Sequence, residues 1–171
     1  MGSSKNAIVI GAGIVGLATA RALALQGYRV KVFERSQQAV GASIRNFGMV
    51  WPIGQPTGKL YETALRSRSI WKECCKEAGI WHAENGSLHL AYHYDEWEVL
   101  EEFVAENQVV RPAVSLLAKK QVREKSAVAV LKGLKGALWC SDELIVDPRE
   151  AIGKLPAYFT EKHGIEFHFG V

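Results

Sequence analysis

Residues 7–34 read AIVIGAGIVGLATARALALQGYRVKVFE, and this stretch decides the fold. A short apolar run leads directly into three glycines, which are Gly11, Gly13 and Gly16. A helical pattern follows, and then a second apolar run that ends in Glu34. This order of strand, glycine-rich turn, helix, strand and acidic residue is typical of a βαβ unit that binds a dinucleotide.

Each glycine has a distinct expected role. Gly11 allows the tight turn out of the first strand, and Gly13 carries no side chain that would block an approaching pyrophosphate. Gly16 lets the helix pack closely on the sheet. The alternative is a βαβ unit that binds nothing, in which the glycines serve only the geometry of the chain.

The helix start and the end of the second strand supply the polar groups. We expect free N–H groups around Ile14 and Val15, at the positive end of the helix dipole, where an anion is favoured. Glu34 can accept hydrogen bonds from both hydroxyls of an adenosine ribose. Arg35 could meet the 2′-phosphate of NADP, but Glu34 beside it would repel that phosphate. The motif alone leaves NAD and FAD open.

Composition places the chain among ordinary globular proteins. It has 171 residues, of which 48% are hydrophobic and 23% charged. A net charge of +3 with dispersed charges gives no indication of a nucleic-acid partner. Cys74 and Cys75 are adjacent and Cys140 is alone, so we expect no disulfide or metal framework and a cytoplasmic location. Arg21 interrupts the apolar run at the N-terminus too early for a membrane span.

The middle of the chain changes character. Residues 41–56 are rich in small residues and predict a loop, and residues 58–78 have the spacing of a helix. Alternation over 86–95 predicts a half-buried antiparallel strand, and 96–107 predicts an acidic helix. The stretch 109–142 indicates only short strands or loops.

The last part of the chain predicts a helix and a strand. Asp147 is expected as the N-cap with Glu150 reaching back to it, and Pro156 as a kink or break near the middle. Gly164 can end the helix, and residues 165–169 alternate as a strand.

These elements predict an α/β fold in which an inserted α+β piece interrupts a Rossmann-like FAD-binding unit. We assign residues 1–80 to the N-terminal part of the cofactor domain and 81–145 to part of an inserted substrate domain. Residues 146–171 return to the cofactor domain. The three parallel strands expected here are fewer than a doubly wound domain needs, so the predicted fold is truncated.

The choice of FAD comes from a resemblance. Residues 7–35, together with GASIRNFGMVWP from Gly41 onward, resemble the D-amino-acid-oxidase-type FAD-dependent oxidoreductases. That group contains glycine and sarcosine oxidases and D-amino-acid dehydrogenases. The second stretch looks closest to a bacterial branch associated with aminophosphonate breakdown. The Gly86–Leu88 strand and the Val146–Arg149 helix start also lie where this family places them. The resemblance covers most of the chain, as the N-terminal portion of a longer enzyme.

The resemblance implies a set of FAD contacts in the two glycine-containing segments. The implied residues are Gly11, Gly13, Ile14, Val15, Gly16, Glu34, Arg35, Ala42, Ser43, Arg45, Asn46 and Gly48. The chemistry of the second segment agrees, because Ser43 and Asn46 are short hydrogen-bonding groups and Arg45 is a fork suited to phosphate. The alternative is a surface loop in which Ser43 and Asn46 only cap turns.

Other candidates are weaker. His89 and His93 are four residues apart on an expected strand, roughly 13 Å, which is too far for one metal ion. Cys140 next to Trp139 is expected to be a buried structural thiol. Trp51 is expected to be a packing residue, although it directly follows the loop that resembles a flavin-binding segment. We therefore predict no metal site.

The resemblance implies a flavin-dependent enzyme that oxidises the C–N bond of a small amine or amino acid by hydride transfer to the flavin. In this family the substrate-binding and flavin-closing residues come mostly after position 171, so no catalytic residue is assigned. Two alternatives stay open, a non-catalytic nucleotide-binding module or inactive remnant and an NAD-dependent dehydrogenase. The substrate, the electron acceptor and the oligomeric state are left open.

Overall fold

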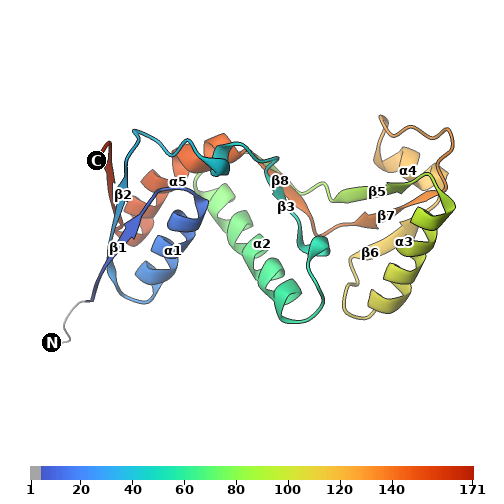
Figure 1. Cartoon of the computed structure of the whole chain (residues 1–171), viewed down its shortest axis with the longest axis horizontal. Helices are drawn as coiled ribbons and strands as arrows, with labels where there is room; N and C mark the ends of the chain where they lie inside the picture. The colour runs from blue at the N-terminus through green and yellow to red at the C-terminus, as the bar shows by residue number, and fades with distance from the viewer. Residues whose placement is uncertain (1–4) are drawn as a thin grey trace. The chain divides into compact units, whose positions relative to one another are not determined.

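The structure is a computed structural model that describes residues 5–171. The chain divides into two compact units (Figure 1). Unit 1 contains the described part of Met1–Met49, with Ser69–His82 and Ile145–Val171. Unit 2 contains Val50–Arg68 and Ala83–Leu144.

Unit 1 is built on a parallel sheet of three strands. The strands are β1 (Asn6–Ile10), β2 (Arg29–Glu34) and β9 (Glu166–Phe169), in the order β1-β2-β9. Val9 lies opposite Val32 in one pairing, and Val32 lies opposite Phe167 in the other. Helix α1 (Ile14–Leu25) connects β1 to β2. The predicted βαβ unit and the returning parallel strand are confirmed, and the fold is α/β.

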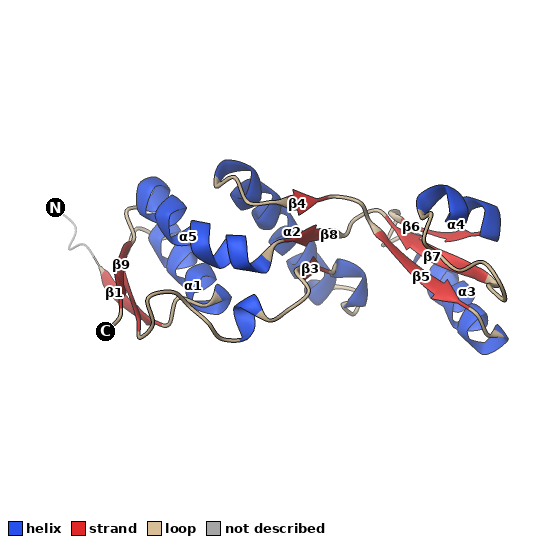
Figure 2. Ribbon diagram, turned by 90° about the horizontal axis from the view of Figure 1, so that it is seen from above, coloured by secondary structure: helices blue, strands red, loops and turns tan. Residues whose placement is uncertain are grey.

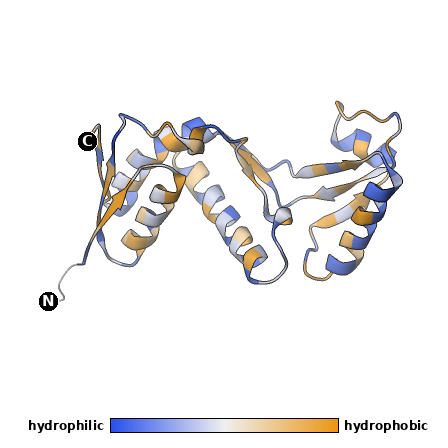
Figure 3. Ribbon diagram, viewed as in Figure 1, coloured by the Kyte–Doolittle hydropathy of each residue, from blue (hydrophilic) through white to orange (hydrophobic). Residues whose placement is uncertain are grey.

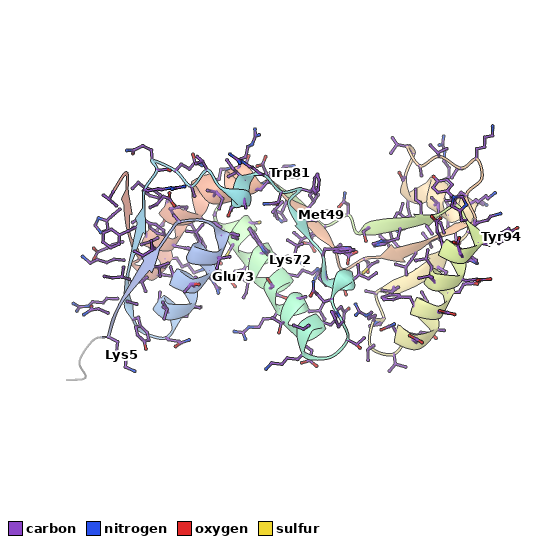
Figure 4. The ribbon with its side chains drawn as sticks, in the orientation of Figure 1. Lys5, Met49, Lys72, Glu73, Trp81 and Tyr94 are labelled. Carbon is purple, nitrogen blue, oxygen red and sulfur yellow. The ribbon has the colours of Figure 1, made fainter. Side chains whose placement is uncertain are left out.

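The core of unit 1 lies between this sheet and its helices. Figure 3 shows β1 as a strongly hydrophobic strand. Helix α5 (Pro148–His163) packs against α1. The side chains that fill this core are buried and apolar; they include Val9, Leu17, Ala20, Val30, Val32, Ile152, Leu155 and Phe159. Glu73, labelled in Figure 4, forms an ion pair with Arg21 of α1 at 3.3 Å.

The ends of α5 follow the predicted capping chemistry. The Asp147 carboxylate accepts hydrogen bonds from the backbone N–H groups of Arg149 and Glu150, at 2.8 and 2.9 Å. Gly164 ends the helix with a φ of 65°, a left-handed conformation that favours glycine. Both the start and the end of this helix were predictable from local sequence.

The break that was one of the two outcomes expected at Pro156 does not occur, and the expected role of Glu150 was wrong. The helix continues through Pro156. Proline removes one N–H donor, and the buried residues on both sides of it, Leu155 and Tyr158, hold the helix against the rest of unit 1. Glu150 does not reach back to the N-cap; its carboxylate accepts from the Trp81 N–H at 2.9 Å and from Lys154 Nζ at 2.7 Å.

Four elements have residues in both units. They are α2 (Lys59–Glu77), β3 (Met49–Val50), β4 (His82–Ala83) and β8 (Leu144–Val146). The three strands form a short sheet in the order β3-β8-β4. Two short 3₁₀ turns, η1 (Ala42–Ile44) and η2 (Pro52–Gly54), lie in the predicted loop. The predicted helix over 58–78 is confirmed as α2.

Unit 2 is an antiparallel sheet with a helix on each face (Figure 2). Its strands are β5 (Ser87–Ala91), β6 (Val114–Leu117) and β7 (Gly136–Cys140), in the order β5-β7-β6. Helix α3 (Tyr94–Asn107) contributes Phe103 to the cluster around Leu138, and α4 (Lys119–Lys125) contributes Val122 to the cluster on the other face.

The predicted antiparallel strand is confirmed, but it is shorter than expected. It ends at Ala91, and α3 begins at Tyr94 and not at Glu96. The Glu96 carboxylate accepts from the N–H groups of Tyr92 and His93, at 2.7 and 3.0 Å. These bonds satisfy the N–H groups of the N-cap and of the residue before it, so the chain can leave the strand early.

A buried arginine fixes the start of unit 2. Arg111 is only 2% exposed and has no carboxylate partner among residues 5–171. Its guanidinium donates to Asn107 Oδ1 and to the backbone carbonyls of Ile53 and Gln55. The group lies over the ring of Tyr61, 4.1 Å from its centroid. A charged donor thus holds the η2 segment against α3 and α2.

Cys74, Cys75 and Cys140 are free and buried. Burial raises the pKa of the Cys140 thiol to about 12, as suits the expected structural role. Within residues 5–171, no helix has both the length and the apolar character that crossing a bilayer requires.

Candidate dinucleotide site

The glycine-rich turn is tightly closed. Gly11 has a φ of 96°, and its N–H donates to the Phe33 carbonyl at 2.7 Å, which joins the turn to the end of β2. A Cβ placed on Gly16 would lie 1.9 Å from the Gly11 carbonyl oxygen. Position 16 therefore admits no side chain unless the backbone moves.

The N-terminus of α1 is partly capped by a distant side chain. Gly13 is the N-cap, and the Ile14 N–H donates to the hydroxyl of Ser43 at 3.0 Å. The expectation of a free N–H at Ile14 was therefore wrong. The N–H groups of Val15 and Gly16 lie in the first turn, where no helical carbonyl can accept from them. No acidic residue lies in that turn, so the positive end of the helix dipole is not neutralised by the helix itself.

Ser43 lies close to the motif because Gly13 has no side chain. A Cβ on Gly13 would approach Ser43 Oγ to 3.1 Å, which is tighter than an ordinary contact. The Ser43 oxygen accepts from Ile14, and its own proton stays available for an anion. Gly13 and Ser43 together form a concave surface that offers hydrogen-bond donors.

Glu34 is held in place by two backbone donors. Its Oε2 accepts from the Ala12 N–H at 3.0 Å, and its Oε1 accepts from the Ser36 N–H at 3.1 Å. These two bonds lower the pKa of Glu34 below its ordinary value, with a smaller contribution from the Arg35 charge. Each carboxylate oxygen keeps a second acceptor position, so the group can still receive two hydroxyl donors.

A pocket of about 240 Å³ lies where these groups meet. It is lined by Gly13, Glu34, Arg35, Ser36, Ala39, Val40, Gly41, Ala42 and Ser43. Five residues of the sequence-based set line it, from both predicted segments. The other seven, Gly11, Ile14, Val15, Gly16, Arg45, Asn46 and Gly48, are not among its lining residues.

At the end of the second segment, Asn46 and Gly48 make their contacts within the protein. Asn46 Nδ2 donates to the Ser43 carbonyl, and Asn46 Oδ1 accepts from the Gly48 N–H, both at 2.7 Å. Gly48 is buried with a φ of 70°, and a Cβ there would lie 1.9 Å from the Val146 carbonyl oxygen. Asn46 thus caps a turn, as the alternative interpretation of this loop expected. The backbone of Gly48 lies close to β8, and this contact is why the position has no side chain. The Arg45 side chain is exposed, and its guanidinium has no partner within residues 5–171.

Sequence reasoning missed the backbone around the carboxylate. Ala12 and Ser36 hold Glu34, and residues 39–41 complete the wall of the pocket. A serine two residues after a carboxylate is a recognisable local turn signal, so Ser36 could have been found. The bond from Ala12 spans 22 residues of sequence and has no local signal.

The polar groups fit FAD. The pocket offers a fixed carboxylate for a ribose, a free hydroxyl proton and an arginine, and the unsatisfied N–H groups of the first turn of α1 follow Gly13 in its wall. No group of three or more His, Cys, Asp and Glu side chains suited to a metal ion occurs in the described part of the chain.

Comparison with known proteins identifies the family. The profile described as "FAD dependent oxidoreductase" (DAO) matches residues 6–171. Glycine oxidase of Pseudomonas aeruginosa is 46% identical over 50 residues, which are 29% of this chain and 14% of that protein. Human mitochondrial L-2-hydroxyglutarate dehydrogenase is 28% identical over 170 residues, 95% of this chain and 36% of that protein.

A solved structure agrees with the sequence matches. The glycine oxidase of Geobacillus kaustophilus superposes with a TM-score of 0.80 at 25% identity, over 97% of this chain and 46% of that one. The chain spans less than half the length of each of these three proteins. The family implies FAD as the cofactor, as the sequence predicted. Since the family profile matches nearly the whole chain, this protein belongs to the DAO family of FAD-dependent oxidoreductases.

Proposed function

We propose that the pocket at Gly13, Glu34 and Ser43 holds the adenosine and pyrophosphate part of FAD. The observation that carries the proposal is that Glu34, Ser43 and Gly13 line one pocket, in which Ser43 approaches the backbone of Gly13 closely because Gly13 has no side chain. Glu34 would bind the ribose hydroxyls, and Ser43 with the first turn of α1 would bind the pyrophosphate. Arg35 and Arg45 would lie at the edge of the site and contribute positive charge.

We further propose that the protein oxidises the C–N bond of a small amine or amino acid. Bound flavin would supply the hydride acceptor, while the protein binds and orients the substrate. The likeness to two glycine oxidases supports this choice. Unit 2, which contains most of residues 81–145, would be part of the substrate domain. A cytoplasmic location is part of the same proposal, supported by three free cysteines.

A second candidate is oxidation of the C–O bond of a 2-hydroxy acid. It is favoured by the 28% identity with human L-2-hydroxyglutarate dehydrogenase over 95% of this chain. The family assignment favours FAD over the NAD-dependent alternative. The third candidate is a non-catalytic module that binds FAD without turnover.

The cofactor proposal is tested by the absorbance spectrum of the purified protein. We expect bound flavin, strong loss of it in Gly13→Glu, and weakened retention in Glu34→Gln. Glu166→Gln is the matched control, because Glu166 pairs with Lys31 on the same sheet outside the pocket. Circular dichroism would verify that each variant is folded. Equal flavin content in all four proteins would contradict the assignment.

The reaction is tested by anaerobic mixing of the flavin-loaded protein with panels of amines, amino acids and 2-hydroxy acids. Bleaching by amines or amino acids supports C–N oxidation, and bleaching only by hydroxy acids supports the second candidate. A flavin that stays oxidised with every compound supports the non-catalytic module.

A further inference from the structure

Unit 2 contains a line of three polar side chains that the proposed cofactor site does not use, and it runs from a buried glutamate to a half-buried histidine. Glu143 is 4% exposed, and its Oε1 accepts from the Ile53 N–H at 3.0 Å. Its Oε2 accepts from the hydroxyl of Ser87. The Ser87 oxygen in turn lies 3.1 Å from Nε2 of His89. The line runs from the carboxylate through the hydroxyl to the imidazole.

The hydrogen bonds fix which nitrogen of His89 carries a proton. The Ser87 proton is directed to Glu143, so the Ser87 oxygen can only accept from the imidazole. Nε2 therefore carries the hydrogen, and Nδ1 of the neutral ring is left as an acceptor. Within residues 5–171, Nδ1 of His89 has no hydrogen-bond partner. Nδ1 of His89 can therefore accept a hydrogen bond from a ligand.

The imidazole belongs to the wall of an apolar pocket. The pocket has a volume of about 170 Å³ and is lined by Trp51, Ile53, His89, Leu100, Phe103 and Leu138. The Trp51 and His89 rings are stacked, with their centroids 6.1 Å apart and their planes 23° from parallel. Apolar cavities of about this size hold molecules with about the bulk of a benzene ring. His89 is the only titratable side chain among the lining residues.

We propose that this pocket binds a small amine with an apolar body and that His89 accepts the proton of its nitrogen. One N–H bond of the ammonium breaks and an Nδ1–H bond forms, which leaves a neutral amine and an imidazolium. The Nε2–H stays on Ser87, and the carboxylate of Glu143 stabilises the new positive charge through it. The choice of an amine as the donor rests on the proposed function, whereas the pocket and the line of hydrogen bonds stand without it.

A purely structural role would make a different prediction. In that case Ser87 and Glu143 only tie the η2 segment to β5, and His89 is a bystander that donates to Ser87. Removing the imidazole would then leave ligand binding unchanged. The two roles are separated by measurements that report binding and the state of the ring, not stability.

The experiment is a titration of the full chain, followed by NMR of the histidine ring nitrogens and protons. The probes are benzylamine, toluene, benzyl alcohol and benzyltrimethylammonium. They share the apolar body and differ in whether they offer a hydrogen-bond donor or a proton. We expect benzylamine to shift the His89 resonances toward the imidazolium form. Toluene and the quaternary ammonium should bind about tenfold more weakly, as one lost hydrogen bond to a charged group implies.

Variants test each member of the line. His89→Gln should weaken benzylamine binding by about tenfold. Ser87→Ala should leave the pocket intact and mix the two ring tautomers of His89. His93→Gln is the matched control, because His93 is exposed and lies outside the pocket, and it should bind benzylamine normally.

The outcomes separate this inference from the cofactor proposal, because the titration does not require flavin. Unaltered binding in His89→Gln would overturn the inference, and so would tighter binding of benzyl alcohol than of benzylamine. Saturable benzylamine binding that is weakened about tenfold in His89→Gln and unchanged in His93→Gln would support it. Either result holds whether or not the protein retains FAD.

Discussion

Replacing Gly16 with alanine would place a methyl group inside the glycine-rich turn. The new Cβ would lie 1.9 Å from the Gly11 carbonyl oxygen and 3.0 Å from the Gly11 carbonyl carbon. Real Cβ atoms essentially never approach other atoms closer than 3.0 Å, so the oxygen and the methyl group must separate by at least 1.1 Å. Both atoms belong to the backbone or are attached directly to it, so no side chain can rotate away.

The expected loss of stability is about 3 kcal/mol, near the upper end for overpacking a core, because α1 must move away from β1. Alanine would otherwise favour a helix by about 1 kcal/mol over glycine. Gly153→Ala provides the matched control, since Gly153 is exposed on α5 and its Cβ would meet only Gln38 Nε2, at 3.3 Å. We expect that control to be neutral or stabilising by up to about 1 kcal/mol.

The assay is urea unfolding followed by circular dichroism, with hydrogen exchange of the β1 and β2 amides to report on unit 1 alone. Gly16→Ala should unfold at a lower urea concentration and exchange faster in those strands, while Gly153→Ala should do neither. If Gly16→Ala unfolds at the same midpoint as the unchanged protein, the close approach of α1 to the turn is not built as described.

Two further predictions concern buried or fixed charges. Arg111→Met should lower the free energy of unfolding by about 2 kcal/mol, because two backbone carbonyls lose a charged donor; unchanged urea stability would show that the buried charge contributes nothing. The second concerns Glu34, whose pKa in the folded protein is lowered from an ordinary value of 4.5. The stability that the Glu34 carboxylate adds is therefore fully present above pH 4.5 and is lost as the pH falls through the lower pKa of the folded protein. Glu34→Gln should therefore lose less stability than the unchanged protein between about pH 5 and pH 3, and parallel urea midpoints would contradict this.

The elements of unit 1 were predictable because their signals are local. The apolar run, three glycines and helical spacing over 7–34 specify β1, α1 and β2 without knowledge of the rest of the chain. Asp147 and Gly164 mark the ends of α5 by side-chain and backbone chemistry within a few residues. No break occurs at Pro156, because tertiary packing outweighs the loss of one helical hydrogen bond.

Unit 2 was harder because its order depends on distant pairing. The residues of β7 are all buried or half-buried between α3 and α4, and their apolar character does not alternate. The seven-residue helix α4 has a single buried side chain, Val122, so its periodicity is weak. The link from Ser87 to Glu143 spans 56 residues and could be found only in the folded chain.

The candidate cofactor site also has a part that the sequence predicts and a part that only the folded chain reveals. Gly13, Glu34 and Ser43 were chosen from the sequence and lie together at one pocket. The bond from Ile14 to Ser43 and the bond from Ala12 to Glu34 join positions 29 and 22 residues apart, which no local pattern reveals. Asn46 and Gly48 satisfy each other and β8, so their resemblance-based role as cofactor contacts stays a prediction.

The carboxylate of Glu34 is already immobilised before any ligand arrives. Its two backbone bonds fix the rotamer, so a ribose would bind without the loss of side-chain entropy that a free glutamate suffers, about 1.5 kcal/mol. The same arrangement makes the position intolerant of a shorter acid. An aspartate could reach the Ser36 N–H or the ribose, but it would withdraw from the Ala12 N–H and leave that donor without its partner. Preorganisation for the ligand thus depends on one methylene group.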